Sequence, residues 1–241
     1  MAFENTFQWS HTRARTFQQC KRLYYYSYYG FWGGWEAAAP AETRLLYALK
    51  KMVTVPMWIG SIVHECIEHA MKSAKAGTIV RLDELQTMAL QLASSGWLDS
   101  RKGAWKNDPK KAVNLAEHYY RRLVEPEILS ANFGAMMRSL EAFHRSEVFR
   151  VACAEPASIL AVEEMMTFPV GSVPVVMVAD LALKRGEECH IYDWKTGPSA
   201  PTVADQLAVY ALGAVSKWRY PREKVRVFVA YLAENTIQEV S

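Results

Sequence analysis

Long apolar runs are missing from this sequence. No stretch approaches the roughly 20 consecutive apolar residues that cross a bilayer, and the first residues, which include Glu4, Gln8 and His11, do not form the apolar segment of a signal peptide. We therefore expect a cytoplasmic protein without membrane contacts. Hydrophobic residues still make up 51% of the 241 positions, so the chain can bury a sizeable core.

The chain also has little cysteine and little net charge. Its four cysteines, Cys20, Cys66, Cys153 and Cys189, include no Cys-x-x-Cys pair, which argues against a zinc knuckle and favours reduced thiols. The net charge of +3 does not require a nucleic-acid partner, although a nearly neutral protein can contain a basic groove. No Gly-x-x-x-x-Gly-Lys-Ser/Thr motif occurs, so ATP-driven unwinding would need another chain.

Helical patterns come first along the chain, and strand patterns follow. Ser10 is a candidate N-cap for a helix that includes 13–24, within an N-terminal region rich in aromatic residues and arginine. Apolar spacing predicts further helices over 60–75, 82–94, 110–129 and 131–150. Beyond Pro156 the sequence predicts strands over 158–168, 173–184 and 189–195, a helix over 201–218 and a strand over 225–233.

This order of elements predicts one α/β or α+β domain that spans residues 1–241. Within it, residues 61–150 are expected to be mainly helical, and residues 157–232 are expected to form the catalytic sheet core.

Charged residues interrupt the most apolar of the predicted strands. Asp193 and Lys195 alternate with Ile191, Tyr192 and Trp194, although acidic residues and lysine are depleted from strands and costly to bury unpaired. The alternative is an exposed strand whose charges form ordinary salt bridges.

Hairpin geometry brings the acidic residues together. A turn centred on Gly186 and Glu187 places Asp180 opposite Asp193, where facing Cα atoms lie about 4.5–5.5 Å apart. A turn centred on Gly171 and Ser172 places Glu163 opposite Asp180, unless a bulge intervenes. Lys195 shares the face of Asp193 because it lies two residues further along the strand.

Such a patch predicts phosphodiester hydrolysis. Carboxylates this close repel one another, and a shared proton or a divalent cation relieves the repulsion. Oxygen ligands suit Mg²⁺ or Mn²⁺. A lysine beside the cation can hold a phosphate oxygen or orient the attacking water.

Four segments resemble the motifs of one nuclease family. They are FQWSHTRARTFQQCKRLYYYSYY, IGSIVHECIEHA, VADLALKRGEECHIYDWKTG and DQLAVYALG. In this order they are similar to the motifs of PD-(D/E)XK nucleases of the RecB-like branch, which includes helicase-associated nuclease domains and CRISPR-associated RecB-like exonucleases. The resemblance implies a restriction-endonuclease-like α/β core: a mixed central sheet with flanking helices and a large N-terminal helical portion.

The resemblance also implies roles for individual residues. It assigns His64, Asp180 and Asp193 as ligands of Mg²⁺ or Mn²⁺ and Lys195 as the catalytic lysine. It further places Glu163, Gln206 and Tyr210 in the catalytic site. Without the other motifs, we would interpret His64 as a structural histidine. Gln206 and Tyr210 would then be ordinary residues at the edge of a helix.

The sequence departs from the family pattern at two positions. Met177 stands where the family usually has glycine, three residues before the first acid. Iron–sulfur members have three further cysteines near the C-terminus, whereas no cysteine follows Cys189 here. We therefore expect no iron–sulfur cluster in this chain and a buried structural thiol at Cys20.

The expected function is metal-dependent hydrolysis of DNA phosphodiester bonds, by an exonuclease or end-processing enzyme in DNA repair, recombination or phage/CRISPR defence. Its expected partners are DNA, as single strands or duplex ends, and a helicase or a recombination or CRISPR protein. An inactive nuclease-like module that binds nucleic acid, or a scaffold for a partner protein, is the alternative.

The residues predicted to bind nucleic acid, by phosphate contacts and base stacking, are Arg13, Arg15, Lys21, Arg22 and Tyr24. Packing of the aromatic rings into the core is the competing role for this region.

Overall fold

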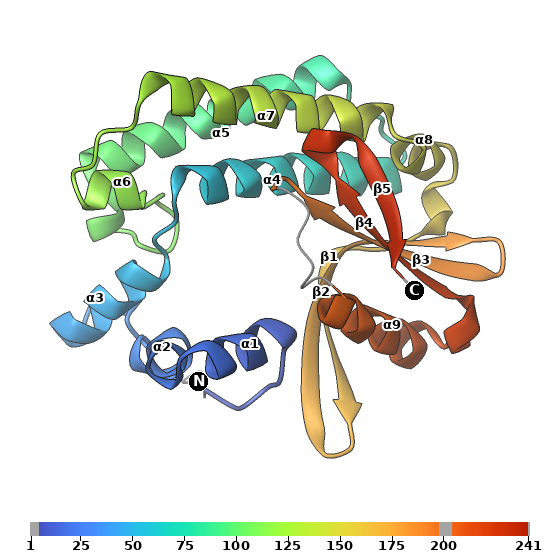
Figure 1. The fold of residues 1–241 in the computed structure, drawn as a ribbon, viewed down its shortest axis with the longest axis horizontal. Coiled ribbons are helices and arrows are strands. Elements are labelled where there is room, and N and C mark those ends of the chain that lie inside the picture. The colour runs from blue at the N-terminus through green and yellow to red at the C-terminus, as the bar shows by residue number, and fades with distance from the viewer. Residues whose placement is uncertain (1–4, 198–203, 241) are drawn as a thin grey trace.

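A computed structural model of the chain describes residues 5–197 and 204–240 (Figure 1). Helices make up most of the described chain before residue 159, and strands predominate after it. The helices are α1 (His11–Gln19), α2 (Lys21–Tyr25), α3 (Ala41–Lys50), α4 (Val55–Lys75), α5 (Leu82–Lys102), α6 (Ala116–Tyr119), α7 (Pro126–Arg145), α8 (Glu147–Ala154) and α9 (Ala204–Trp218). The first part of the helix predicted over 201–218 lies outside the described residues.

The N-terminal helix begins where its capping residue predicted. The Ser10 hydroxyl accepts a hydrogen bond from the Arg13 N–H at 3.2 Å, which satisfies one of the free donors of the first turn. The helix is not continuous to Tyr24, because Cys20 has an extended backbone and separates α1 from α2. A π-helical turn over Tyr26–Gly30 then follows α2.

The predicted boundary near Ser130 is wrong. Helix α7 begins at Pro126, a residue that suits the first helical turn because it has no N–H to leave unpaired, and runs through Ser130 to Arg145. The break lies at Ser146, whose hydroxyl accepts the Phe149 N–H at 3.1 Å and caps α8. Most of the segment predicted as a helix over 110–129 is irregular, and it contains only the short α6 and the first turn of α7.

Five strands form one mixed sheet in the order β1-β2-β3-β4-β5. Strands β3 and β4 are parallel, with α9 between them in the chain, and the other neighbours are antiparallel. The last strand was missing from the sequence-based prediction. The strands are β1 (Ile159–Val170), β2 (Val173–Arg185), β3 (Glu188–Lys195), β4 (Val225–Tyr231) and β5 (Thr236–Val240). The fold is therefore the expected α/β type, a mixed sheet with flanking helices.

The predicted hairpin registers are confirmed. Leu181, which follows Asp180, pairs with Tyr192, which precedes Asp193, and Glu164 pairs with Ala179. Both turns contain a glycine with positive φ, Gly171 and Gly186, each at +60°, where glycine carries no steric penalty.

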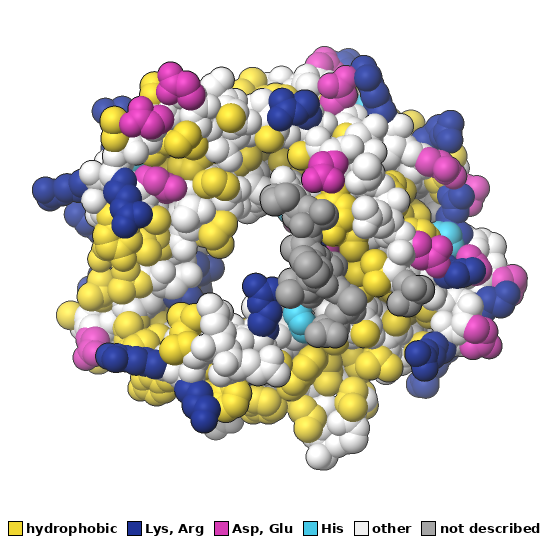
Figure 2. Space-filling view, in the orientation of Figure 1, with side chains coloured by type: hydrophobic (Ala, Val, Ile, Leu, Met, Phe, Trp, Pro, Cys, Tyr) yellow, Lys and Arg dark blue, Asp and Glu magenta, His cyan; other side chains and the backbone are white. Residues whose placement is uncertain are grey.

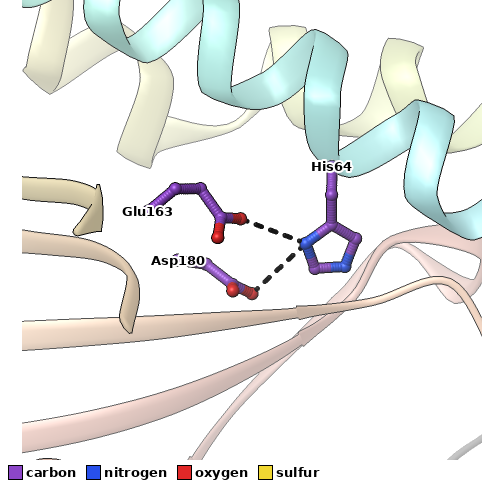
Figure 3. A group of neighbouring side chains, drawn as sticks. All are labelled: His64, Glu163 and Asp180. Carbon is purple, nitrogen blue, oxygen red and sulfur yellow. Dashed lines mark hydrogen bonds and ion pairs between the residues drawn. The ribbon is translucent and has the colours of Figure 1, made fainter. Parts of the chain in front are cut away.

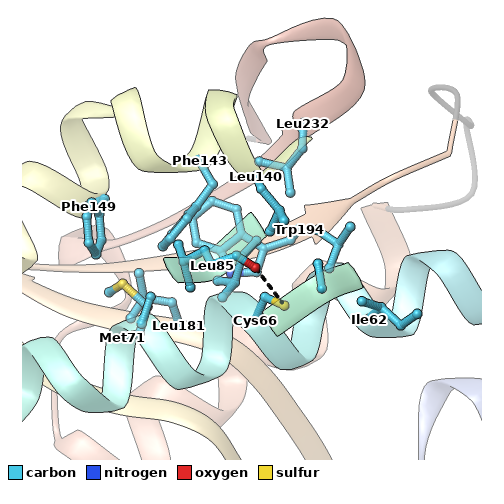
Figure 4. Packing of buried hydrophobic residues seen from close by; sticks show 14 of the residues in the cluster. Ile62, Cys66, Met71, Leu85, Leu140, Phe143, Phe149, Leu181, Trp194 and Leu232 are labelled. Carbon is cyan, nitrogen blue, oxygen red and sulfur yellow. Dashed lines mark hydrogen bonds between the residues drawn. The ribbon is translucent and has the colours of Figure 1, made fainter. Parts of the chain in front are cut away.

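Hydrophobic cores cover both faces of the sheet. One core joins Leu181 and Trp194 of the sheet to Phe143 of α7 and residues of α4, such as Met71 (Figure 4). The other core packs α9 against the opposite face, around Ile191. Each fully buried side chain of this size contributes about 1.5–3 kcal/mol of hydrophobic free energy. The cores thereby hold α4 and α9 firmly beside the sheet.

The N-terminal segment returns to the sheet and closes a ring-like outline (Figure 1). Trp9 pairs with Val175 of β2 through hydrogen bonds of 2.8 Å from the Trp9 N–H to Pro174 and 2.7 Å from the Val176 N–H to Trp9. Figure 2 shows an opening that passes through the molecule in this view, with Lys or Arg and His side chains at its edge. Within the described residues, no helix combines the length and apolar character needed to span a membrane.

Candidate active site

The three acids lie where neighbouring strands lose their regular pairing. The ladder between β2 and β3 ends at Leu181 and Tyr192, and the Asp180 Oδ2 atom accepts the Trp194 N–H at 2.6 Å. Glu163 has no partner in the pairing of β1 with β2, although the residues on either side of it are paired. Its φ is +46°, which is unusual inside a strand. A left-handed backbone at a non-glycine residue stores strain, and such strain concentrates at functional sites.

Helix α4 brings a histidine to two of these acids (Figure 3). The His64 Nδ1 atom lies 3.3 Å from the Glu163 Oε1 atom and 3.7 Å from the Asp180 Oδ2 atom. One turn earlier, a Cβ atom at Gly60 would lie only 2.8 Å from the Thr196 Oγ1 atom. The absence of a side chain at Gly60 therefore lets α4 approach the end of β3 and positions His64.

The third acid is held by α9 and by Lys195. Asp193 is 2% exposed, and its Oδ1 atom accepts hydrogen bonds from the Tyr210 hydroxyl at 3.2 Å and the Gln206 Nε2 atom at 3.4 Å. Gln206 and Tyr210 lie one helical turn apart and also bond to each other, at 2.6 Å. The Asp193 Oδ2 atom forms an ion pair with the Lys195 Nζ atom at 2.5 Å and has no hydrogen-bond partner among the described residues.

Burial and crowding change the proton affinities of these groups. Burial raises the pKa of Asp180 to about 7, and the charges of Asp193 and Glu163 add to this effect against the opposing charge of His64. Burial alone would lower the pKa of His64, but its hydrogen bond to Glu163 and the neighbouring negative charges raise it overall. Burial also raises the pKa of Tyr210, which keeps this hydroxyl a neutral donor to Asp193.

The geometry fits a divalent cation. His64, Glu163 and Asp180 each offer a ligand atom, and these atoms lie within 4.8 Å of one another. Carboxylate oxygens with one imidazole nitrogen suit a hard or borderline divalent cation. The buried Asp193 Oδ2 atom, which forms an ion pair with Lys195, is a further oxygen beside this group. Within the described residues, the compact group thus contains Glu163 rather than Asp193, which differs from the predicted ligand set.

The structure brings the predicted catalytic residues of the sheet and α9 into one site. Direct contacts link Lys195 to Asp193, Asp193 to Gln206 and Tyr210, and His64 to Glu163 and Asp180. The roles of these residues remain predictions.

The predicted nucleic-acid residues separate into two groups. Arg13 is 7% exposed, and its guanidinium donates hydrogen bonds to the Tyr24 and Tyr29 hydroxyls and to the Gln8 carbonyl. These bonds and the surrounding aromatic rings make Arg13 the centre of a packed cluster, which differs from its predicted role as a phosphate ligand. Tyr24 belongs to the same cluster. In contrast, Arg15, Lys21 and Arg22 are exposed.

Two other expectations change in the structure. Cys20 is exposed rather than buried, because it lies between α1 and α2, where its Sγ atom accepts the Leu23 N–H at 3.4 Å. Met177 is buried against α9, and a Cβ atom at Gly213 would lie 2.1 Å from its Sδ atom. The bulk of Met177 is thus accommodated by a glycine on the facing helix.

Sequence reasoning missed His11. This residue lines a cavity of about 280 Å³ together with Gln206 and Tyr210. The N-cap at Ser10 was the available signal, since it places His11 at the first position of α1.

The mixed sheet, its clustered acids and the adjacent lysine define a restriction-endonuclease-like α/β protein. The family model described as the PD-(D/E)XK nuclease superfamily matches residues 8–240, and the chain belongs to this superfamily. Comparison with curated proteins and with solved structures finds no match.

Proposed function

We propose that this protein is a metal-dependent deoxyribonuclease of the RecB-like branch that processes DNA ends. The observation that carries the proposal is the Asp193–Lys195 pair, 2.5 Å apart, beside the group formed by His64, Glu163 and Asp180. Nucleases of this superfamily need both a charge-stabilising lysine and a cluster of acids, and here the two share one site.

Each residue of the site has a defined task in this proposal. His64, Glu163 and Asp180 hold Mg²⁺ or Mn²⁺, with Asp193 as an additional ligand. When bound, the cation would supply a water of lowered pKa and would neutralise charge at the phosphate. Lys195 holds a phosphate oxygen or orients the attacking water. Gln206 and Tyr210 fix the orientation of Asp193 through their hydrogen bonds.

Features of the N-terminal region support DNA strands as the substrate. Arg15, Lys21 and Arg22 form no ion pair with a carboxylate of residues 5–197 or 206–240, so they are available for phosphates. Phe17 and Tyr25 are 47% and 55% exposed, and such rings can stack on unpaired bases.

The central opening supports a preference for ends. A single strand that passes through a closed outline must enter by a free end (Figure 2). Repair, recombination and phage or CRISPR defence all produce such ends, and a helicase or a recombination or CRISPR protein would supply them as a partner. The alternative of an inactive binding module is less favourable, because clustered acids repel a polyanion unless a cation binds.

One incubation experiment tests the proposal. Labelled single-stranded and duplex DNA would be incubated with the protein and Mn²⁺ or Mg²⁺, with and without a chelator. We expect cleavage that needs the cation and that disappears in Lys195→Ala. Lys184→Ala is the matched control, because Lys184 is an exposed lysine on the same hairpin.

Two outcomes oppose the proposal. Full activity in Lys195→Ala would remove the lysine from the mechanism. Absence of cleavage by the wild-type protein, with DNA binding retained, would favour the inactive module.

A further inference from the structure

A cavity adjoins the catalytic acids on the side of α9. It has a volume of about 280 Å³ and lies between the start of α1, the middle of β2 and the first turns of α9. Polar groups come from Ser10, His11 and Thr12 on one side and from Gln206 and Tyr210 on the other. Val176, Val178 and Val209 contribute apolar walls.

This cavity is continuous with the catalytic machinery. Gln206 and Tyr210 line it, and the same two side chains donate hydrogen bonds to the Asp193 carboxylate. A group bound in the cavity would therefore contact the two residues that hold Asp193.

The N-terminal segment is anchored where it can serve this cavity. Trp9 pairs with Val175 of β2, and α1 begins two residues later with His11. The pairing thus places His11 against the sheet and opposite α9, rather than on a freely moving arm. His11 is partly buried, and Arg15, one turn further along α1, is exposed on the same side of the helix.

We propose that this cavity binds the nucleotide adjacent to the scissile phosphodiester, with His11 contacting the phosphate of that nucleotide. This proposal rests on the proposed nuclease function. No acidic residue is among the described residues that line the cavity, whereas one imidazole, three hydroxyl groups and one amide are. These groups suit an anionic phosphate and a sugar, and the valine walls suit the apolar faces of a nucleotide.

The experiment measures binding rather than turnover, so it does not depend on cleavage. A fluorescent single-stranded oligonucleotide would be titrated with the Lys195→Ala protein and Mn²⁺. The same titration would be repeated with a set of oligonucleotides in which one phosphate at a time is replaced by an uncharged methylphosphonate. His11→Ala and His69→Ala would each be added to this background. His69 is the matched control, because it is an exposed histidine on α4 outside the cavity.

We expect His11→Ala to weaken binding by about tenfold, the effect of losing one hydrogen bond to a charged group. In the Lys195→Ala protein, replacing the phosphate at one position by a methylphosphonate should weaken binding by a similar factor. In the protein that also carries His11→Ala, the same replacement should have no further effect. His69→Ala should change neither result. His11→Gln, which keeps a donor, should recover part of the affinity, and it tests the same contact if His11→Ala does not fold.

Unchanged affinity in His11→Ala, or undiminished sensitivity to every methylphosphonate, would overturn the subsite. The proposed nuclease function would fail by a different result. In that case the wild-type protein would not cut DNA, although the effect of His11→Ala would still depend on one phosphate position.

Discussion

Replacing Asp180 with Asn measures the energetic cost of burying an ionised carboxylate beside two other acids. The amide oxygen of Asn can still accept the Trp194 N–H, which Asp180 receives at 2.6 Å, and the side chain keeps its size. The substitution removes one ionisable group from beside Glu163 and Asp193. A change in stability then reports mainly the charge.

The size of the stability change follows from the pKa of Asp180. Burial raises this pKa from 3.8 to about 7 in the folded state. Each pKa unit corresponds to about 1.4 kcal/mol, so the ionised carboxylate destabilises the fold by at most about 4 kcal/mol. Because the folded pKa lies above the unfolded one, the folded state binds more protons between about pH 4 and pH 7. Stability of the cation-free wild-type protein therefore falls as the pH rises through this window.

The assay is urea unfolding at pH 5.5 and pH 8, in a chelator and in Mn²⁺. In the chelator at pH 8, we expect Asp180→Asn to be more stable than the wild-type protein by about 1–4 kcal/mol, and we expect this difference to shrink at pH 5.5. In Mn²⁺, the wild-type protein should gain stability by binding the ion, and the variant should gain much less.

The matched control is Asp99→Asn, since Asp99 is exposed on α5. It should produce no pH-dependent change. A stability difference for Asp180→Asn that is the same at both pH values would refute the raised pKa. An equal gain from Mn²⁺ in the variant and the wild-type protein would show that Asp180 is not a ligand.

Three further substitutions test other parts of the structure. Tyr210→Phe removes a hydrogen bond to Asp193 and should lower kcat about tenfold with little change in KM; an unchanged kcat in steady-state kinetics would show that Tyr210 does not position the acid. Gly213→Ala should destabilise the fold by about 1–3 kcal/mol through its clash with Met177. Adding Met177→Ala should cost less than the two separate effects combined, and strict additivity in urea unfolding would contradict this packing. Cys20→Ser should preserve stability, because serine is a good N-cap for α2. Protein purified without oxygen should be colourless, and a brown colour lost in this variant would reveal a cluster bound through Cys20.

The local parts of the site could be predicted because they depend on short loops. A two-residue turn sets the register of its hairpin, so the positions of Gly171 and Gly186 were enough to align β1, β2 and β3. The same logic worked for the N-cap at Ser10. The predicted helix break at Ser130 was wrong, because α7 continues through this residue.

The roles of Arg13 and Cys20 depended on the surroundings of each side chain. An arginine among aromatic residues has the same pattern whether it binds phosphate or packs, and only the folded N-terminal region encloses Arg13 within hydrogen bonds. The sequence predicted a buried thiol at Cys20, whereas the break between α1 and α2 exposes this side chain.

The sequence by itself determined the acids, the lysine and their alignment across the hairpins, because these follow from strand periodicity and turn position. Only the tertiary structure decided that His64 meets Glu163, 99 positions away, and that His11 lies beside Gln206. Contacts of this kind depend on how α4, α9 and the N-terminal segment pack on the sheet. That packing comes from the summed burial of many side chains, which no local pattern specifies.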